Sequence, residues 1–219
     1  MYIMQLKNCY YYFNNALSAK FCSEVIKYAE SKENQLALTG DTVSRGRDLE
    51  LNPLTKKEIK NIQKIRKSNI TWLDDYWIWK EIKPYIHEAN RAAGWNYEWD
   101  YSEFFKFTRY KKGQFYGWHE DSFPEPYDRP NTPEIHGRIR KLSVSCVLSD
   151  PQKDFTGGDL EFNVNHPNKS EKENQVVCKE ARTLGSIIVF PSFVRHRVKK
   201  VKEGTRYSLV IWNVGKPFR

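Results

Sequence analysis

Three residues in the second half of the chain have the types and spacing of a metal site. His119 and Asp121 form a His-x-Asp pair at the end of the strand-like run 110–121. Side chains at positions i and i+2 of a strand point to the same face, so the pair can reach one ion while Glu120 faces away. His196, in a later strand-like run, can supply a second imidazole. Two histidines and one carboxylate form a facial site that suits non-haem Fe(II) and leaves coordination positions open.

An arginine follows the last of these three residues in the sequence. Arg206 lies ten residues after His196, and its guanidinium is a rigid fork that binds a carboxylate through two hydrogen bonds. A His-x-Asp pair alone arises easily by chance. A functional site is predicted by four features in order. These are the pair, a Gly-Gly turn at 157–158, a late histidine and this arginine.

In that order the motifs resemble those of the 2-oxoglutarate- and Fe(II)-dependent dioxygenases, and within them the prolyl 4-hydroxylase-like branch. The resemblance extends from about Trp99 to Gly215 and is looser before it. It implies that His119, Asp121 and His196 bind Fe(II), with 2-oxoglutarate and O2 as cosubstrates and ascorbate as reductant. It also implies hydroxylation of a peptidyl proline with release of succinate and CO2. Retention of the aspartate points to hydroxylation rather than halogenation.

The resemblance further implies a binding site for 2-oxoglutarate formed by Tyr110, Arg206, Ser208 and Trp212. Arg206 is expected to pair with the distal carboxylate, where many prolyl 4-hydroxylases have lysine. Tyr110, nine residues before His119, matches a tyrosine whose hydroxyl supports the same carboxylate. Ser208 offers a further hydroxyl, and Trp212 resembles the tryptophan of the pocket floor.

Two residues resemble those that contact the peptide substrate. Tyr116 stands three residues before His119, and Arg140 opens the strand-like run 139–149. A packing role for either side chain stays open. The polar stretch 39–53 resembles the substrate-side loop of the hydroxylases, and an ordinary surface loop is the alternative.

The elements that must position these residues are mainly strands. From Trp99 onward the hydrophobic pattern has a period of two, which predicts strands at 99–110, 113–119, 139–149, 159–163, 175–180, 185–190, 194–201 and 206–214. Eight strands after a helical first half predict an α+β, mainly β fold. The expected architecture is a double-stranded β-helix, a jelly-roll or cupin-like barrel, braced by N-terminal helices.

The first half of the chain predicts the brace. A short aromatic strand is expected at 8–15, a helix after the N-cap Ser18, and a second helix from Asp74 to about Ala93. Residues 54–64 favour a short helix and residues 65–73 a strand. We expect one domain over 1–219, with the brace and substrate-side loop in 1–98 and the barrel core in 99–215.

Composition places the chain among soluble globular proteins, since 29% of its residues are charged and no apolar run approaches membrane-spanning length. The first residues lack the pattern of a signal peptide, which favours a cytoplasmic location. The four cysteines are scattered without a C-x-x-C pair and are expected to be free thiols.

The formal net charge of +9 leaves several functions to weigh. It suits an anionic cosubstrate, an acidic peptide or nucleic acid. Nucleic-acid demethylases of the same superfamily typically have a second arginine six residues after the first, and Trp212 occupies that position here. We therefore favour a proline-containing peptide or protein as partner over nucleic acid. A small-molecule hydroxylase and a non-catalytic cupin-like binding protein remain the alternatives, and the oligomeric state stays open.

Overall fold

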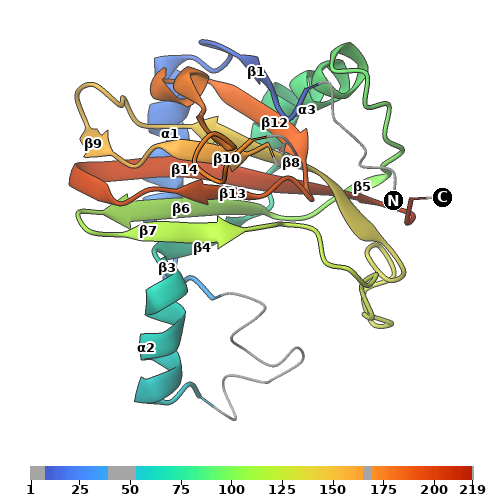
Figure 1. Cartoon of the computed structure of the whole chain (residues 1–219), viewed down its shortest axis with the longest axis horizontal. Helices are drawn as coiled ribbons and strands as arrows, with labels where there is room; N and C mark the ends of the chain where they lie inside the picture. The colour runs from blue at the N-terminus through green and yellow to red at the C-terminus, as the bar shows by residue number, and fades with distance from the viewer. Residues whose placement is uncertain (1–7, 39–52, 165–168, 219) are drawn as a thin grey trace.

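The computed structural model describes residues 8–38, 53–164 and 169–218 of the chain. Two antiparallel sheets pack face to face, and helices cover the outer face of the larger sheet (Figure 1). This is the expected double-stranded β-helix braced by helices. The predicted loop at 39–53 falls almost wholly on residues 39–52, which lie outside the described ranges.

The larger sheet is built around one long strand, β14, which pairs with β8 on one side and β6 on the other. The main order is β1-β12-β8-β14-β6-β4-β2, with β5 and β9 also paired to β14. Its strands are β1 (Tyr11–Phe13), β2 (Gln35–Leu36), β4 (Asn69–Leu73), β5 (Tyr101–Ser102), β6 (Phe105–Lys111), β8 (Ile139–Val147), β9 (Phe155–Gly157), β12 (Ile187–Pro191) and β14 (Val201–Gly215).

The smaller sheet has the order β11-β10-β13-β7-β3. Its strands are β3 (Arg66–Lys67), β7 (Phe115–His119), β10 (Leu160–Asn163), β11 (Gln175–Val177) and β13 (His196–Val198). The two predicted histidine ligands therefore lie on neighbouring strands of this sheet.

Local sequence signals explain where the helices begin. Helix α1 (Ala19–Glu30) is capped by the Ser18 hydroxyl, which accepts a hydrogen bond from the backbone N–H of Phe21. Helix α2 (Lys56–Ile65) starts with a reciprocal capping box between Thr55 and Glu58. Helix α3 (Tyr76–Ala92) follows Asp75, and one 3-10 turn, η1, spans Lys179–Arg182.

Alternation along the strands divides the core into two layers. On β12, Ile187 and Val189 pack with the apolar faces of α1 and α3, whereas Ile188 and Phe190 point between the sheets. Successive strand residues face opposite sides, so one strand serves both layers. Burying both faces of the larger sheet fixes its register, because a slip by one residue would exchange the two sets.

Each predicted run after Trp99 contains a strand, but β9 was missed and β14 begins at Val201 rather than at 206. The predicted strand 65–73 is two strands, β3 and β4, which belong to different sheets. Three other runs are interrupted or shortened. The run 99–110 breaks at Glu103-Phe104, between β6, whose Lys106 stands opposite Val210 of β14, and β5, whose Ser102 stands opposite Asn213. The run 194–201 breaks at 199–200, because the chain passes there from the smaller to the larger sheet. The predicted strand 175–180 ends at Val177 and continues into the 3-10 turn.

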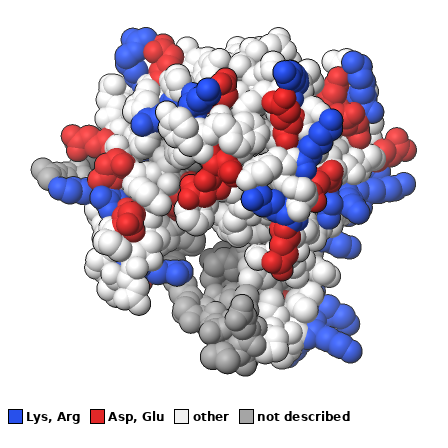
Figure 2. Space-filling model, turned by 180° about the vertical axis from the view of Figure 1, so that it is seen from behind, with Lys and Arg blue, Asp and Glu red and all other residues white. Residues whose placement is uncertain are grey.

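Two global properties bear on the expected environment of the protein. Within the described ranges, no helix combines the length and apolar character needed to cross a bilayer. Figure 2, which shows the molecule from behind, has Lys and Arg side chains interspersed with Asp and Glu over that face. The net positive charge is thus accompanied there by many neutralising carboxylates.

Gly204 is a backbone position that only glycine fits. Its φ is +71°, and a Cβ at this position would overlap the carbonyl oxygen of Asp154. Gly113 has a similar φ of +80° with nothing within 4 Å of an added Cβ. We expect Gly113→Ala to lower the free energy of unfolding by about 1–2 kcal/mol and Gly204→Ala by about 3 kcal/mol or more. Urea unfolding of both variants measures the difference, and equal losses would contradict the overlap.

Candidate metal centre

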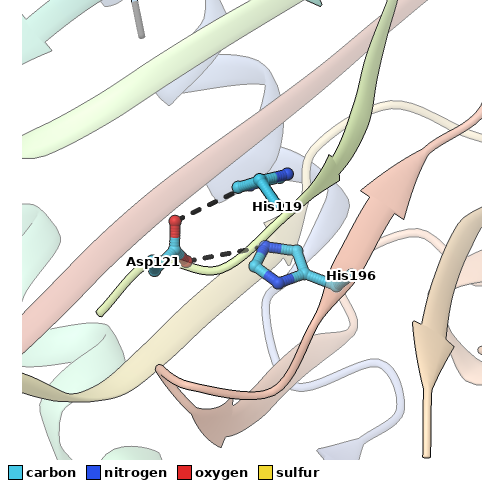
Figure 3. Close-up of side chains that lie close together, drawn as sticks. All are labelled: His119, Asp121 and His196. Atoms are coloured by element: carbon cyan, nitrogen blue, oxygen red, sulfur yellow. Dashed lines mark ion pairs between the residues drawn. The ribbon is translucent and has the colours of Figure 1, made fainter. Parts of the chain in front are cut away.

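The register of two strands places the histidines together. β7 and β13 are antiparallel neighbours in which His119 stands directly opposite His196. Directly opposed residues have Cβ atoms about 4.5–5.5 Å apart, so both imidazoles reach the same space. Asp121 follows two residues after His119 and turns toward both rings, as Figure 3 shows. Its Oδ1 lies 3.7 Å from His119 Nε2, and its Oδ2 lies 3.5 Å from His196 Nε2.

Backbone carbonyls determine which ring nitrogens face the carboxylate. His119 Nδ1 lies 2.9 Å from the carbonyl oxygen of Gly117, and His196 Nδ1 lies 2.9 Å from that of Val194. A carbonyl oxygen can only accept, so each neutral ring carries its proton on Nδ1. Both Nε2 lone pairs are then available to a metal ion, and the carbonyls fix the orientation of the rings.

Buried serines hold the carboxylate of Asp121, which is 6% exposed. The Ser143 hydroxyl donates to Oδ2 at 2.8 Å and also lies 2.9 Å from the Ser192 hydroxyl. The Asp121 backbone N–H donates to the Ser192 carbonyl. The sequence reasoning missed both serines. A serine at an inward-facing position of the apolar strand β8 is the signal that points to such a role.

The charges of the site are coupled. Burial raises the pKa of Asp121, but nearby His196, His119 and Lys106 outweigh it and hold this pKa well below its usual range. Burial and the neighbouring His196 lower the pKa of His119 well below its usual value, despite Asp121. At neutral pH the site therefore offers an ionised carboxylate and a neutral His119 imidazole, as metal binding requires.

The donor set fits a divalent metal ion. One ligand atom from each of His119, Asp121 and His196 lies within 4.8 Å of the others. Nitrogen and oxygen ligands sit about 2.0–2.2 Å from a small metal ion, so two of them lie at most about 4.4 Å apart. Both measured nitrogen–oxygen distances satisfy that limit. Two imidazoles and one carboxylate are the donor set of non-haem Fe(II) centres.

The larger sheet supplies the predicted anion-binding residues. Arg206 on β14 stands opposite Tyr110 on β6, and its guanidinium carbon lies 5.5 Å from the tyrosine ring centre. Arg206 is 2% exposed and donates from Nη1 to the Ser208 hydroxyl at 3.0 Å. Burial lowers the pKa of its guanidinium, which nevertheless keeps its charge at neutral pH. Among the described residues no carboxylate pairs with Arg206.

An inner cavity joins the two sheets. It is lined both by the three candidate metal ligands and by Arg206, Tyr110 and Ser208. The candidate metal ligands and the arginine therefore face one common space. Thr108, Ser145 and Leu160 complete much of its wall. The sequence alone predicted the metal ligands and Arg206, Tyr110 and Ser208, but it did not show that they line one cavity.

An outer cleft of about 510 Å³ opens next to the metal ligands. Tyr116 and Arg140, the predicted substrate contacts, both line it. The Tyr116 ring stacks on His119, with ring centres 3.4 Å apart and planes inclined by 15°. Trp212, predicted to contact 2-oxoglutarate, lines this outer cleft and is absent from the lining of the inner cavity.

Glu103, which the sequence reasoning missed, occupies the guanidinium fork of Arg140. Arg140 Nε and Nη2 each donate to a Glu103 carboxylate oxygen at 2.6 Å. Arg140 Nη1 also reaches the Asp121 carbonyl oxygen at 3.4 Å, and its guanidinium carbon lies 3.6 Å from the Trp212 ring centre. Arg140 thus links the cleft wall to the loop that carries the metal ligand.

Known proteins resemble the second half of this chain. The family model described as the 2OG-Fe(II) oxygenase superfamily matches residues 105–214, which are 110 of the 219 residues. A PKHD-type hydroxylase of Alteromonas mediterranea is 31% identical over 106 residues, and one of Pseudoalteromonas atlantica is 32% identical over 108 residues. The matches cover 48% and 49% of this chain and 41% of each relative. The chain thus spans less than half the length of these relatives.

Solved structures share the fold at low sequence identity. The viral collagen prolyl hydroxylase of Paramecium bursaria Chlorella virus-1 matches with a TM-score of 0.61 and 17% identity, covering 97% of this chain and 99% of that one. A prolyl-4-hydroxylase of Pseudomonas putida matches with a TM-score of 0.59 and 17% identity, covering 96% and 95%. Since the family model covers half of the chain and includes every candidate metal ligand, the chain belongs to the 2OG-Fe(II) oxygenase superfamily.

Proposed function

We propose that this chain is an Fe(II)- and 2-oxoglutarate-dependent hydroxylase of the prolyl 4-hydroxylase type, which acts on a proline in a peptide and releases succinate and CO2. One observation carries the proposal. The metal ligands and Arg206 line a single inner cavity, and this cavity adjoins a wide cleft with aromatic walls. We assign the first space to the cosubstrate and the second to a peptide.

In this proposal His119, Asp121 and His196 hold Fe(II), which supplies O2 activation coupled to oxidative decarboxylation of 2-oxoglutarate when it is bound. Arg206 binds the distal carboxylate of 2-oxoglutarate, with hydroxyl support from Tyr110 and Ser208. This placement leaves the opposite end of the cosubstrate toward the metal ligands. Burial of the guanidinium strengthens the pairing, because a charge pair interacts more strongly where water is excluded.

Tyr116 positions the substrate in this proposal. Its ring is held between the His119 imidazole and Arg66, whose guanidinium carbon lies 4.4 Å from the ring centre. Within the described chain its hydroxyl makes no hydrogen bond, so the hydroxyl is available to a ligand in the cleft. Burial raises the pKa of Tyr116, which keeps this hydroxyl protonated as a hydrogen-bond donor at neutral pH.

The names of similar proteins support a peptidyl proline as the target. Two of the structures with this fold are prolyl hydroxylases, and a further one, from Trichoplax adhaerens, is a prolyl hydroxylase in complex with a peptide fragment of hypoxia inducible factor. That structure matches with a TM-score of 0.59 and 18% identity. Ascorbate as the reductant and a cytoplasmic location are further parts of the proposal.

The metal ligands are tested with Co(II) alone, followed by its visible absorption. Removing one imidazole in His196→Ala should weaken Co(II) binding by at least about 100-fold, and Ser143→Ala, which releases the Asp121 carboxylate, by about 10-fold. His87→Ala is the matched control, because His87 stacks on Trp99 outside the site. Binding by His196→Ala equal to that of the wild type would reject the three-residue centre.

The role of Arg206 is tested by anaerobic titration with Fe(II) and 2-oxoglutarate, following the metal-to-ligand charge-transfer absorption. Arg206→Ala should weaken 2-oxoglutarate binding by about 10- to 150-fold, since a hydrogen bond to a charged group contributes about 1.5–3 kcal/mol. Its affinity for Co(II) should stay unchanged. Arg109→Ala, on the neighbouring strand β6 but facing Glu30 outside the cavity, is the control. Equal losses in both variants would refute a specific carboxylate contact.

The substrate is tested with a panel of proline-containing peptides, with and without ascorbate. We expect a mass gain of one oxygen on proline, stoichiometric succinate, and fewer turnovers per enzyme when ascorbate is absent. Tyr116→Phe should lower kcat/KM for the peptide about tenfold while leaving 2-oxoglutarate binding intact. Tyr76→Phe, with an exposed ring far along the chain on α3, should behave as wild type. Succinate formation without modification of any proline would reject the substrate but retain the oxygenase.

A further inference from the structure

A second group of side chains stands where the inner cavity meets the outer cleft. Lys106 lies on β6 four residues before Tyr110, so the two side chains share the inward face of the strand. Lys106 and Arg66 line both the cavity and the cleft, and Trp212 lines the cleft beside them. None of these three is needed for the metal ligation or the 2-oxoglutarate contact proposed above.

Lys106 is a buried lysine with no carboxylate within ion-pair distance among the described residues. It is 6% exposed, and in the described part of the chain its ammonium makes no hydrogen bond or ion pair. Its Nζ lies 4.0 Å from the ring centre of Trp212. Burial lowers the pKa of this ammonium well below its usual value, and the charges of Asp121 and Glu103 only partly oppose the shift. Two half-buried arginines of this protein do have acidic partners, Arg140 with Glu103 and Arg197 with Glu161. An unpaired buried charge is costly, so a ligand that supplies the missing carboxylate is favoured.

Two more donors at the same place lack acceptors. Arg66 is 2% exposed and uses Nε to bind the Ser68 hydroxyl at 2.9 Å, while its two terminal nitrogens have no hydrogen-bond acceptor among the described residues. The indole Nε1 of Trp212 is buried and has no hydrogen-bond partner in the same part of the chain. Buried donors are nearly always satisfied in folded proteins, so the unsatisfied Trp212 N–H, in a cleft also lined by Lys106 and Arg66, marks a position for an acceptor group.

The nearby carboxylates are already engaged. Asp121 is held by Ser143 and faces the two histidines, and Glu103 is paired with Arg140. The distal carboxylate of 2-oxoglutarate has Arg206, which lines the inner cavity but not the outer cleft. The three unsatisfied donors therefore remain for a ligand that enters from the cleft.

We propose that Lys106, Arg66 and Trp212 Nε1 form a carboxylate-binding subsite that selects substrates with an acidic group next to the reacting carbon. The proposal rests on the function proposed above and narrows its substrate class. The substrate can present this carboxylate from either of two positions. It is either the C-terminal carboxylate of the target residue itself or the side chain of an adjacent acidic residue.

The test measures binding by calorimetry to protein loaded with Mn(II) and 2-oxoglutarate, so that it does not depend on turnover. The first matched pair of probes is N-acetyl-L-proline and N-acetyl-L-prolinamide. A second pair, N-acetyl-Pro-Asp-amide and N-acetyl-Pro-Asn-amide, presents the acidic group on the neighbouring residue. A third pair, N-acetyl-L-valine and N-acetyl-L-valinamide, lacks the pyrrolidine ring.

Wild-type protein should bind the acid of at least one pair about 10- to 100-fold more tightly than its neutral counterpart, as expected for charge-assisted hydrogen bonds. Lys106→Met, of similar length but uncharged, should abolish that preference and leave the affinity for the neutral probe within about threefold. Trp212→Phe, which keeps an aromatic ring but loses the N–H, should reduce the preference in part. Lys111→Met is the control, since Lys111 is an exposed residue of the same strand.

The outcomes distinguish the two sources of the carboxylate, and they separate failure of the subsite from failure of proline as the target. A Lys106-dependent preference in the first pair identifies the C-terminal carboxylate, and one in the second pair the acidic neighbour. A preference confined to the valine pair supports the subsite but rejects proline as the target. Absence of any acid preference in wild type, or a preference that survives Lys106→Met, overturns the subsite. Weaker 2-oxoglutarate binding by Lys106→Met would overturn it too, by assigning the lysine to the cosubstrate.

Discussion

The pairing register between β7 and β13 is the constraint on which the site depends. It places His119 opposite His196, and the turn after β7 adds Asp121 to the same space. A shift of one residue would turn a histidine to the other face of the sheet. The register is fixed on both sides, because β13 also pairs with β10, where Phe162 opposes His196, and β7 also pairs with β3, where Arg66 opposes Tyr116.

A second constraint is that the two sheets carry different parts of the site. The smaller sheet carries the metal ligands, and the larger sheet carries Arg206, Tyr110 and Ser208. The distance between metal and arginine is therefore set by the packing of the two sheets rather than by any loop. Apolar residues such as Phe162, Phe190 and Val198 fill the space between them and keep that distance constant. A rigid separation suits recognition of a short dicarboxylate at both of its ends.

Buried polar groups mark the functional part of the barrel. Most of the interior is apolar, but the region around Asp121 contains Ser143, Ser192, Lys106, Arg66 and Arg206, all buried. Such groups contribute little to net stability when they are paired and cost free energy when they are not. The serines are satisfied by the carboxylate, whereas the Trp212 indole N–H has no hydrogen-bond partner among the described residues and the Lys106 ammonium lies on the Trp212 ring. The unsatisfied donors are the physical basis for assigning a ligand to the cleft.

The sequence by itself determined the parts that depend on short spacing. The alternation of a strand puts His119 and Asp121 on one side, and Ser18 and Thr55 cap helices through contacts three residues away. Only the tertiary structure decided which distant residues meet. It set Ser143 against Asp121, Glu103 in the fork of Arg140, Trp212 in the outer cleft, and the Lys106 ammonium over the Trp212 ring. These contacts join residues 22, 37 and 106 positions apart, and their geometry follows from sheet register and packing, which no local pattern specifies.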